Sequence, residues 1–166
     1  MSHAIAAAPA VDARSLARRS RANLDRLFAA LPLPASGELS GTLRGTVVDA
    51  VGLGRLPPGV RAGLLAALRG PIGVWRGKRF AGAQGTNVWG AGGFERLFAA
   101  FRVEVGPALD GSGSCLRLDY DVPENPLLVR AILGEVRSLG PGLLLGRMHY
   151  RAGSARACVL YFTLEA

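Results

Sequence analysis

Segments in which apolar and polar residues alternate recur along most of the chain, and turn-forming residues separate them. In GELSGTLRGTVV (37–48), Leu39, Leu43 and Val47 share one parity with two glycines, while polar side chains share the other. A period of two is typical of a β-strand. Glycines on the apolar face allow a strand to bend sharply, as in small closed barrels. The segment therefore predicts a strongly curved strand.

Six further segments have strand character: 73–81, about 85–90, 99–105, 115–122, 143–151 and 156–165. The loops between neighbours, such as GPALDGSGS and AGSA, are short and rich in turn residues, which is typical of hairpins. The sequence thus predicts a mainly β fold, either an antiparallel, strongly curved sheet or a closed barrel, with two or three helices. An α+β sheet with helices on one face is the alternative.

Three segments have helical patterns: 13–31, 58–69 and 127–139. The first ends at Pro32, and the second begins with proline and ends with glycine, the expected punctuation. The third begins after Pro126 and stops at the GPG of 140–142. We expect a disordered tail over 1–12 and one domain over 13–166, with the barrel body at 37–165.

The length and composition indicate a globular protein of the cytoplasm. The 166 residues are 49% hydrophobic and 19% charged, which argues against wholesale disorder. No apolar run reaches the ~18 residues that a membrane helix needs. The N-terminus lacks the basic region of a secretion signal. Two cysteines cannot make a disulfide framework, and we expect both in the core.

The net charge of +8 is spread along the chain, with some concentration in the 13–31 segment. Arg14, Arg18, Arg19 and Arg21 give that helix a basic side, which fits peripheral contact with a membrane or partner. Packing that closes one end of the domain is the other interpretation. Nucleic acid is not favoured, because aromatic residues total only 7% and are not interleaved with a basic patch.

The stretch GVWRGKRFAGAQGTNVWG (73–90) contains both tryptophans and the only lysine. Regular strand parity places Trp75 and Arg79 on one face and Arg76 and Lys78 on the other. The three basic residues Arg76, Lys78 and Arg79 are thus divided between the two faces, which argues against a flat phosphate-binding patch. The glycine-rich turn that follows predicts that Trp75 and Trp89 approach each other across a hairpin.

Gly73-Val-Trp75 resembles the Gly-x-Trp signature of the calycin superfamily, the lipocalin-like barrels. Arg147 is similar to the arginine late in those barrels that packs over the signature tryptophan. The resemblance implies a closed barrel around an apolar cavity over about 37–165, with Arg147 against Trp75. The C-terminal half is similar to small bacterial proteins, and that similarity implies no particular activity.

Glu135 falls within the apolar stripe of the expected 127–139 helix, and a buried carboxylate must find a partner or a proton. Arg147 and His149 share a strand face and are the natural partners. Two interpretations remain open. In one, Glu135 and Arg147 form a structural ion pair. In the other, these groups line the polar end of a cavity, with Glu135 and His149 as catalytic candidates.

The sequence therefore predicts a barrel that binds a small hydrophobic ligand, with a carboxylate or carbonyl head. The expected ligand-binding residues are Trp75, Asn87, Trp89, Phe101, Tyr120, Arg147, His149 and Tyr161. One alternative is an enzyme that uses the same cavity for proton transfer, of the isomerase or cyclase type. Another is a basic surface-binding module. No cofactor motif is present, and with two histidines we expect no metal site.

Overall fold

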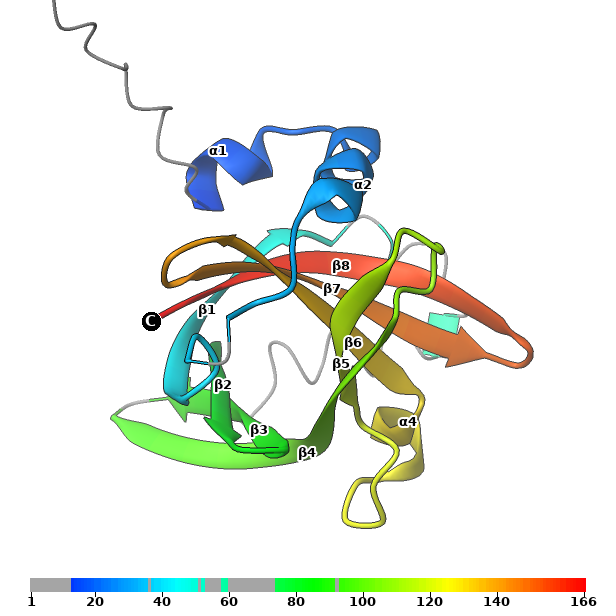
Figure 1. Cartoon of the computed structure of the whole chain (residues 1–166). Coiled ribbons are helices and arrows are strands. Elements are labelled where there is room, and N and C mark those ends of the chain that lie inside the picture. The colour runs from blue at the N-terminus through cyan, green and yellow to red at the C-terminus, as the bar shows by residue number, and fades with distance from the viewer. Residues whose placement is uncertain (1–12, 36, 51, 53–57, 60–73, 92) are drawn as a thin grey trace, which may run out of the picture.

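Eight antiparallel strands pair in sequence order, and the last strand pairs with the first to close a barrel (Figure 1). The structure is a computed structural model that describes residues 13–35, 37–50, 52, 58–59, 74–91 and 93–166. The strands are β1 (Gly41–Asp49), β2 (Val74–Ala81), β3 (Gln84–Ala91), β4 (Phe94–Pro107), β5 (Ser114–Asp119), β6 (Ile132–Gly140), β7 (Leu143–Ala152) and β8 (Ala155–Glu165). The mainly β prediction, with a closed antiparallel barrel and a few helices, is confirmed.

Seven of these strands overlap the seven predicted segments, and β6 is the strand that the sequence pattern missed. The prediction of a helix over 127–139 is wrong, because α4 spans only Leu127–Arg130 and β6 follows. Residues of β6 are buried on both faces. Val136 belongs to the core inside the barrel, and Arg137, on the other face, is buried and donates a hydrogen bond to the carbonyl of Phe28. A strand buried on both faces lacks a clear period-two pattern, and the apolar residues that follow Pro126 fit helical spacing instead.

The predicted 13–31 helix is two helices, α1 (Ala13–Ala17) and α2 (Arg21–Ala30). Ser20 has an extended backbone and caps α2, because its hydroxyl oxygen accepts a hydrogen bond from the Asn23 backbone N–H at 3.3 Å. Such a cap starts a new helix and so interrupts the longer one. The predicted tail at 1–12 and nearly all of the predicted 58–69 helix lie outside the described residues.

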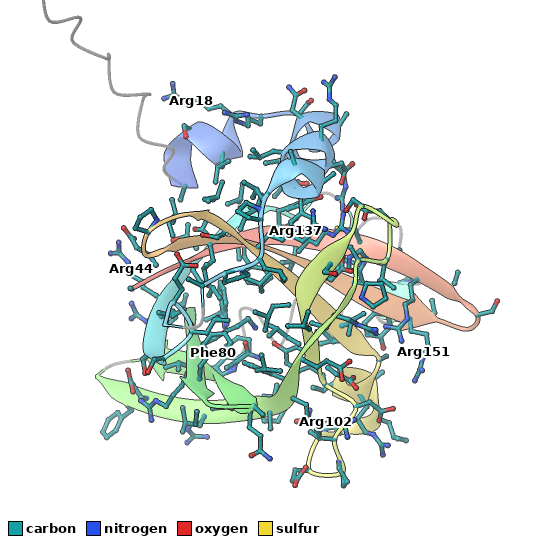
Figure 2. The ribbon with its side chains drawn as sticks, in the orientation of Figure 1. Arg18, Arg44, Phe80, Arg102, Arg137 and Arg151 are labelled. Atoms are coloured by element: carbon teal, nitrogen blue, oxygen red, sulfur yellow. The ribbon has the colours of Figure 1, made fainter. Side chains whose placement is uncertain are left out.

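Apolar side chains pack on both sides of the barrel wall. The inner core includes Leu43, Phe80, Phe101, Leu118, Tyr120, Ile132, Val136, Leu144, Leu160, Phe162 and Leu164. The outer core joins Leu16, Leu24 and Phe28 of the helices to Cys115, Leu145 and Tyr161 of the wall. Figure 1 shows α1 and α2 lying over β7 and β8, and Figure 2 shows Phe80 within the ring of strands. The helices therefore cover one side of the barrel and leave its interior to the strands.

A glycine in β1 makes room for one tryptophan of the interior. A Cβ atom on Gly45 would lie 2.3 Å from the Trp75 ring, a separation that real Cβ atoms do not show. The Trp75 ring packs edge-on against Phe162, with ring centroids 5.6 Å apart. The absence of a side chain at Gly45 thus lets Trp75 lie across the inside of the wall.

Candidate ligand-binding site

A β-bulge in β2 decides which side chains of the 73–90 segment face the interior. Trp75 pairs with Trp89, and the next pair is Gly77 with Val88, so Arg76 is an extra residue. Gly77 has a φ of +145°, which favours glycine. The bulge turns Trp75 and Lys78 to the same inner side. The prediction from regular strand parity, which placed them on opposite faces, is therefore wrong. The predicted approach of Trp75 and Trp89 is confirmed by their direct pairing.

Lys78 is consequently an amine inside the barrel, with only 5% of its surface exposed. Its Nζ donates to Asn87 Oδ1 at 2.6 Å and to Tyr120 Oη at 2.5 Å. Asn87 Oδ1 also accepts from Trp75 Nε1 at 3.2 Å, and Asn87 Nδ2 lies 3.2 Å from Tyr120 Oη. We call Lys78, Asn87 and Tyr120 the Lys78 cluster; β2, β3 and the end of β5 bring it together.

The Lys78 cluster holds a basic group without an acidic partner. No ion pair in the described part of the chain involves Lys78, and both of its hydrogen-bond acceptors are neutral. Burial lowers the pKa of Lys78 to about 7. The rings of Trp75, Phe101, Tyr120 and Phe162 surround Nζ at 5.1 to 5.6 Å from their centroids. Their faces stabilise the remaining positive charge.

A cavity of about 90 Å³ adjoins this cluster. Its lining among the described residues comprises Val47, Trp75, Lys78, Asn87, Trp89, Phe98, Ala99, Tyr120, Val129, Ile132, Gly134, Met148, Leu160 and Phe162. The walls are mostly apolar, and the amine, amide and phenol of the cluster supply the polar groups. Val47, one of the lining residues, is 41% exposed.

The predicted ligand-binding residues fall on both sides of the wall. Trp75, Asn87, Trp89 and Tyr120 line the cavity, and Phe101 lies beside the Lys78 amine. Arg147, His149 and Tyr161 point outward, since each alternates with a residue of the inner core, such as Leu144 or Phe162. The expectation that all eight share one cavity therefore does not match their positions.

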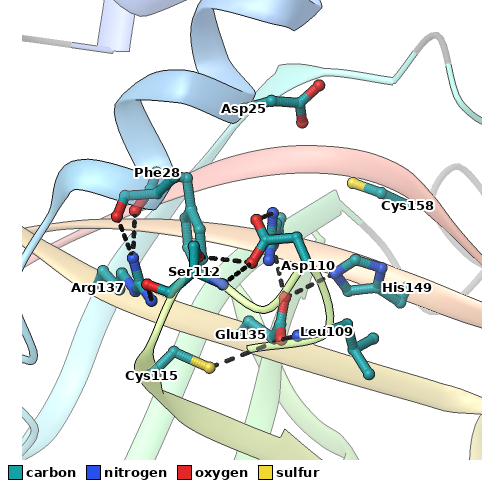
Figure 3. Close-up of polar contacts among 12 residues, drawn as sticks. Asp25, Phe28, Leu109, Asp110, Ser112, Cys115, Glu135, Arg137, His149 and Cys158 are labelled. Atoms are coloured by element: carbon teal, nitrogen blue, oxygen red, sulfur yellow. Dashed lines mark hydrogen bonds and ion pairs between the residues drawn. The ribbon is translucent and has the colours of Figure 1, made fainter. Parts of the chain in front are cut away.

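The outward-facing groups form a second arrangement, the outer carboxylate cluster of Glu135, Arg147, His149 and Asp110. Figure 3 labels Glu135, His149 and Asp110 of this cluster. Glu135 Oε2 accepts from Arg147 Nε at 2.6 Å and lies 2.8 Å from His149 Nε2. Its Oε1 accepts from the Leu109 backbone N–H at 2.6 Å. Arg147 Nη1 donates to Asp110 Oδ2 at 2.8 Å. The Glu135–Arg147 pair of the first interpretation is present.

The outer carboxylate cluster keeps Glu135 ionised although its side chain is fully buried. Burial favours the protonated form, but the hydrogen bonds with His149 and Leu109 and the charge of Arg147 outweigh it and lower the pKa to about 2. Asp110 has a lowered pKa as well, because hydrogen bonds with Arg147 and Ser112 outweigh its desolvation. Each Glu135 oxygen is occupied by donors, which is the arrangement of a structural ion pair.

Arg147 does not pack over Trp75, as the calycin resemblance implied. Its guanidinium carbon lies 4.1 Å from the centroid of the Phe28 ring of α2, on the outer side of the wall. The cation beside Trp75 is Lys78, whose Nζ is 5.6 Å from the ring centroid. Phe28 and Arg147 thus join α2 to the barrel, and the inner cation comes from β2.

The basic residues of the N-terminal helices have two environments. Arg21 is half-buried, donates to the Cys158 carbonyl at 2.6 Å and pairs with Asp49 at 3.3 Å. Arg18 and Arg19 are exposed, and Figure 2 shows Arg18 at the periphery. Leu24 and Phe28, the apolar residues that a membrane contact would use, are buried against the barrel. In the described ranges, no helix is long and apolar enough to cross a bilayer.

Lys78 is the functional candidate that sequence reasoning missed. Two signals mark it: it is the only lysine of the chain, and it follows Gly77, a residue type that bulges favour. Within the described residues, no group of three or more His, Cys, Asp and Glu side chains is arranged to hold a metal ion.

The class of protein that these observations define is a closed, eight-stranded, up-and-down antiparallel barrel with a small, mostly apolar cavity. Comparisons with known proteins bear only on the fold. No family model matches the chain, and no curated protein matches its sequence. It is similar to the crystal structure of a protein from Thermomonospora curvata, with a TM-score of 0.58 and 20% identity over 89% of this chain and 87% of that chain. The barrel is thus supported, whereas no comparison shows membership of the calycin superfamily.

Proposed function

We propose that this protein binds a small apolar molecule with a carbonyl or carboxylate head, and that Lys78 contacts that head inside the barrel. One observation carries the proposal: the Lys78 amine is buried beside an apolar cavity, and its acceptors among the described residues are neutral. Burying an amine away from water and counter-charges costs free energy. A ligand oxygen within reach of Nζ would offset part of that cost.

The cavity supports a ligand of limited size. Ligand sites are typically apolar with a few placed polar groups and have volumes of about 300–1,000 Å³. This cavity has the same character but a volume of about 90 Å³, so a single ring or a short chain is the expected body. Met148 lines it, and the flexible thioether side chain adapts to a somewhat larger occupant.

Catalysis by Glu135 or His149 has less support than binding. Proton transfer in the cavity would require one of these groups to reach it, but both point away from it, and both are buried. Both Glu135 oxygens already accept hydrogen bonds, and His149 Nε2 is engaged with Glu135 Oε2.

The test is a comparison of three aromatic compounds of similar size: benzaldehyde, benzoate and toluene. Each is titrated into the protein and followed by Trp fluorescence and by the shift in Tm, since both tryptophans line the cavity. We expect benzaldehyde, benzoate or both to bind more tightly than toluene. The Lys78→Met variant should remove this preference while toluene still binds.

Arg79→Met is the matched control, because Arg79 is the neighbouring cation and contacts Thr42 and Glu95 on the outer face. It should leave the preference unchanged. If none of the three compounds binds at millimolar concentration, or if Lys78→Met binds benzaldehyde and benzoate as the wild type does, the proposed function is wrong.

A further inference from the structure

We infer that the Lys78 amine forms a reversible imine with the carbonyl carbon of an aldehyde or ketone in the barrel cavity. The inference rests on the proposed function and narrows its ligand to carbonyl compounds. It starts from geometry: Nζ lies beside the cavity, is 5% exposed, and contacts only neutral polar groups among the described residues.

The first requirement for an imine is an unprotonated amine. A carboxylate beside Lys78 would hold it as an ammonium ion, and no such ion pair occurs in the described ranges. Since burial lowers the pKa of Lys78 to about 7, the nucleophilic neutral form is well populated at neutral pH. Desolvation in an apolar pocket is one of the recognised ways in which a lysine becomes a nucleophile.

The second requirement is a proton donor near the reacting oxygen. Tyr120 Oη lies 2.5 Å from Nζ, and burial raises the pKa of this phenol, so it keeps its proton. It is therefore placed to donate to the oxygen of a bound carbonyl. Asn87 Oδ1, 2.6 Å from Nζ, holds the amine from the other side.

The step balances without an oxidant or reductant. The amine lone pair adds to the carbonyl carbon, a C–N bond forms, and the oxygen takes up a proton to give a carbinolamine. The C–O bond then breaks, and the oxygen leaves as water with both protons that the amine loses. The product is a C=N bond, which hydrolysis reverses. When the imine is protonated, the four rings around Nζ stabilise its charge.

A carboxylate ligand is the competing occupant, and it makes a different demand on Lys78. It would pair with the ammonium form and raise the pKa of the amine, whereas an aldehyde needs the neutral form. The two ligands therefore differ in whether a covalent bond forms and in how binding depends on pH.

The experiment is reductive trapping of the full-length protein with benzaldehyde and sodium cyanoborohydride, followed by peptide mapping by mass spectrometry. Lys78 is the only lysine, so the N-terminal amine is the sole other primary amine of the polypeptide. We expect a benzyl adduct on Lys78 at pH 7. Addition of the amine becomes faster as the pH rises through about 7, because more of the amine is neutral. Trapping then slows at higher pH, since cyanoborohydride reduces the protonated imine.

The matched control is Arg79→Lys in an otherwise wild-type chain, which places a second amine next to Lys78 on the outer face. An exposed lysine has a pKa of about 10.4, so its neutral fraction at pH 7 is small. Lys78 should be labelled at least about tenfold faster than this amine at pH 7. Lys78→Met should lose the internal adduct and retain the N-terminal one.

Three outcomes overturn the inference. If benzaldehyde binds and quenches Trp fluorescence but leaves no adduct on Lys78, the imine is wrong while the proposed function stands. If the amine introduced by Arg79→Lys reacts as fast as Lys78 at pH 7, Lys78 has no special reactivity. Failure of every compound to bind, together with no adduct, rejects both proposals.

Discussion

Glu135 and Lys78 are buried charged side chains on opposite sides of one barrel wall, and their surroundings differ in kind. Glu135 has a basic partner in Arg147, a second donor in His149, and a backbone N–H from Leu109. Lys78 has only neutral acceptors in the described residues. Breaking a paired buried charge destabilises a fold, whereas a buried amine without a counter-charge is a candidate for a functional site.

The Glu135→Gln substitution should lower the free energy of unfolding by about 3–5 kcal/mol, because it breaks a buried ion pair and leaves the Arg147 charge short of a partner. Urea denaturation measures the loss. Asp119→Asn is the matched control, since Asp119 pairs with Arg102 at 3.2 Å on the surface. That change should cost less than about 1 kcal/mol. Equal losses would contradict a structural role for the outer carboxylate cluster.

Among the secondary-structure elements, the bulge in β2 positions the Lys78 cluster, and helix α2 covers the outer carboxylate cluster. The bulge places Trp75 and Lys78 together inside the barrel. Helix α2 holds its place through Phe28 and through Arg137, whose Nη1 donates to the Phe28 and Ala29 carbonyls at 2.8 and 2.7 Å. A cation at the C-terminal carbonyls of a helix is favourable for the helix dipole.

Gly77→Ala should destabilise the barrel by more than about 2 kcal/mol, because its Cβ would lie 2.0 Å from the Leu43 carbonyl oxygen and its φ of +145° strains any larger residue. Gly37→Ala is the control, since a Cβ there meets nothing within 4 Å. It should change stability by less than about 0.5 kcal/mol. Denaturant titrations compare the two, and a tolerated Gly77→Ala would mean that the bulge rearranges freely.

Phe28→Ala should cost about 3–5 kcal/mol, because the ring is fully buried between α2 and the wall and lies against Arg147 and Arg137. The outer core would then bind a hydrophobic dye such as ANS. Leu33→Ala is the comparison, since Leu33 is 39% exposed beyond the end of α2. A Phe28→Ala protein as stable as Leu33→Ala would show that α2 contributes little to the barrel.

At the scale of the whole molecule, stability should rise with pH in two separate windows. The pKa of Glu135 falls from 4.5 to about 2 on folding, so the unfolded chain binds this proton first as the pH drops, and stability is lost from about pH 4.5 down to 2. The pKa of Lys78 falls from 10.5 to about 7, so the unfolded chain keeps this proton longer, and stability rises from about pH 7 to 10.5.

Denaturation at a series of pH values measures both windows, and each has its own control. Glu135→Gln should flatten the acidic window and leave the alkaline one, and Lys78→Met should do the reverse. Other groups titrate in both ranges, so the quantity to compare is the difference in slope between each variant and the wild type. A wild-type slope retained in Lys78→Met would contradict an uncompensated buried amine.

The sequence was informative wherever one strand face meets the interior and the other meets solvent. Strand β1 is such a case, and its glycines predicted the curvature. Strands β7 and β8 are buried on both faces along much of their length, and the short AGSA turn between two strand-like runs predicted them instead. Strand β6 is buried on both faces too, but it escaped prediction because the apolar residues that follow Pro126 fit helical spacing. Lys78 escaped because a bulge shifts parity by one residue, and such a shift depends on pairing with β1 and β3 rather than on local pattern. The grouping of Arg147, His149 and Glu135 was predicted, but the side of the wall on which they lie was not.

The bulge in β2 also bears on how the length of this strand can change. Removing one residue from a strand ordinarily exchanges its two faces, and every side chain beyond the deletion is then misplaced. Arg76 is the extra residue of the bulge, so its deletion would leave Trp75, Gly77 and Lys78 in plain alternation, with both Trp75 and Lys78 still inside. Strand β2 therefore contains one position where a codon can be lost while the cavity keeps its amine.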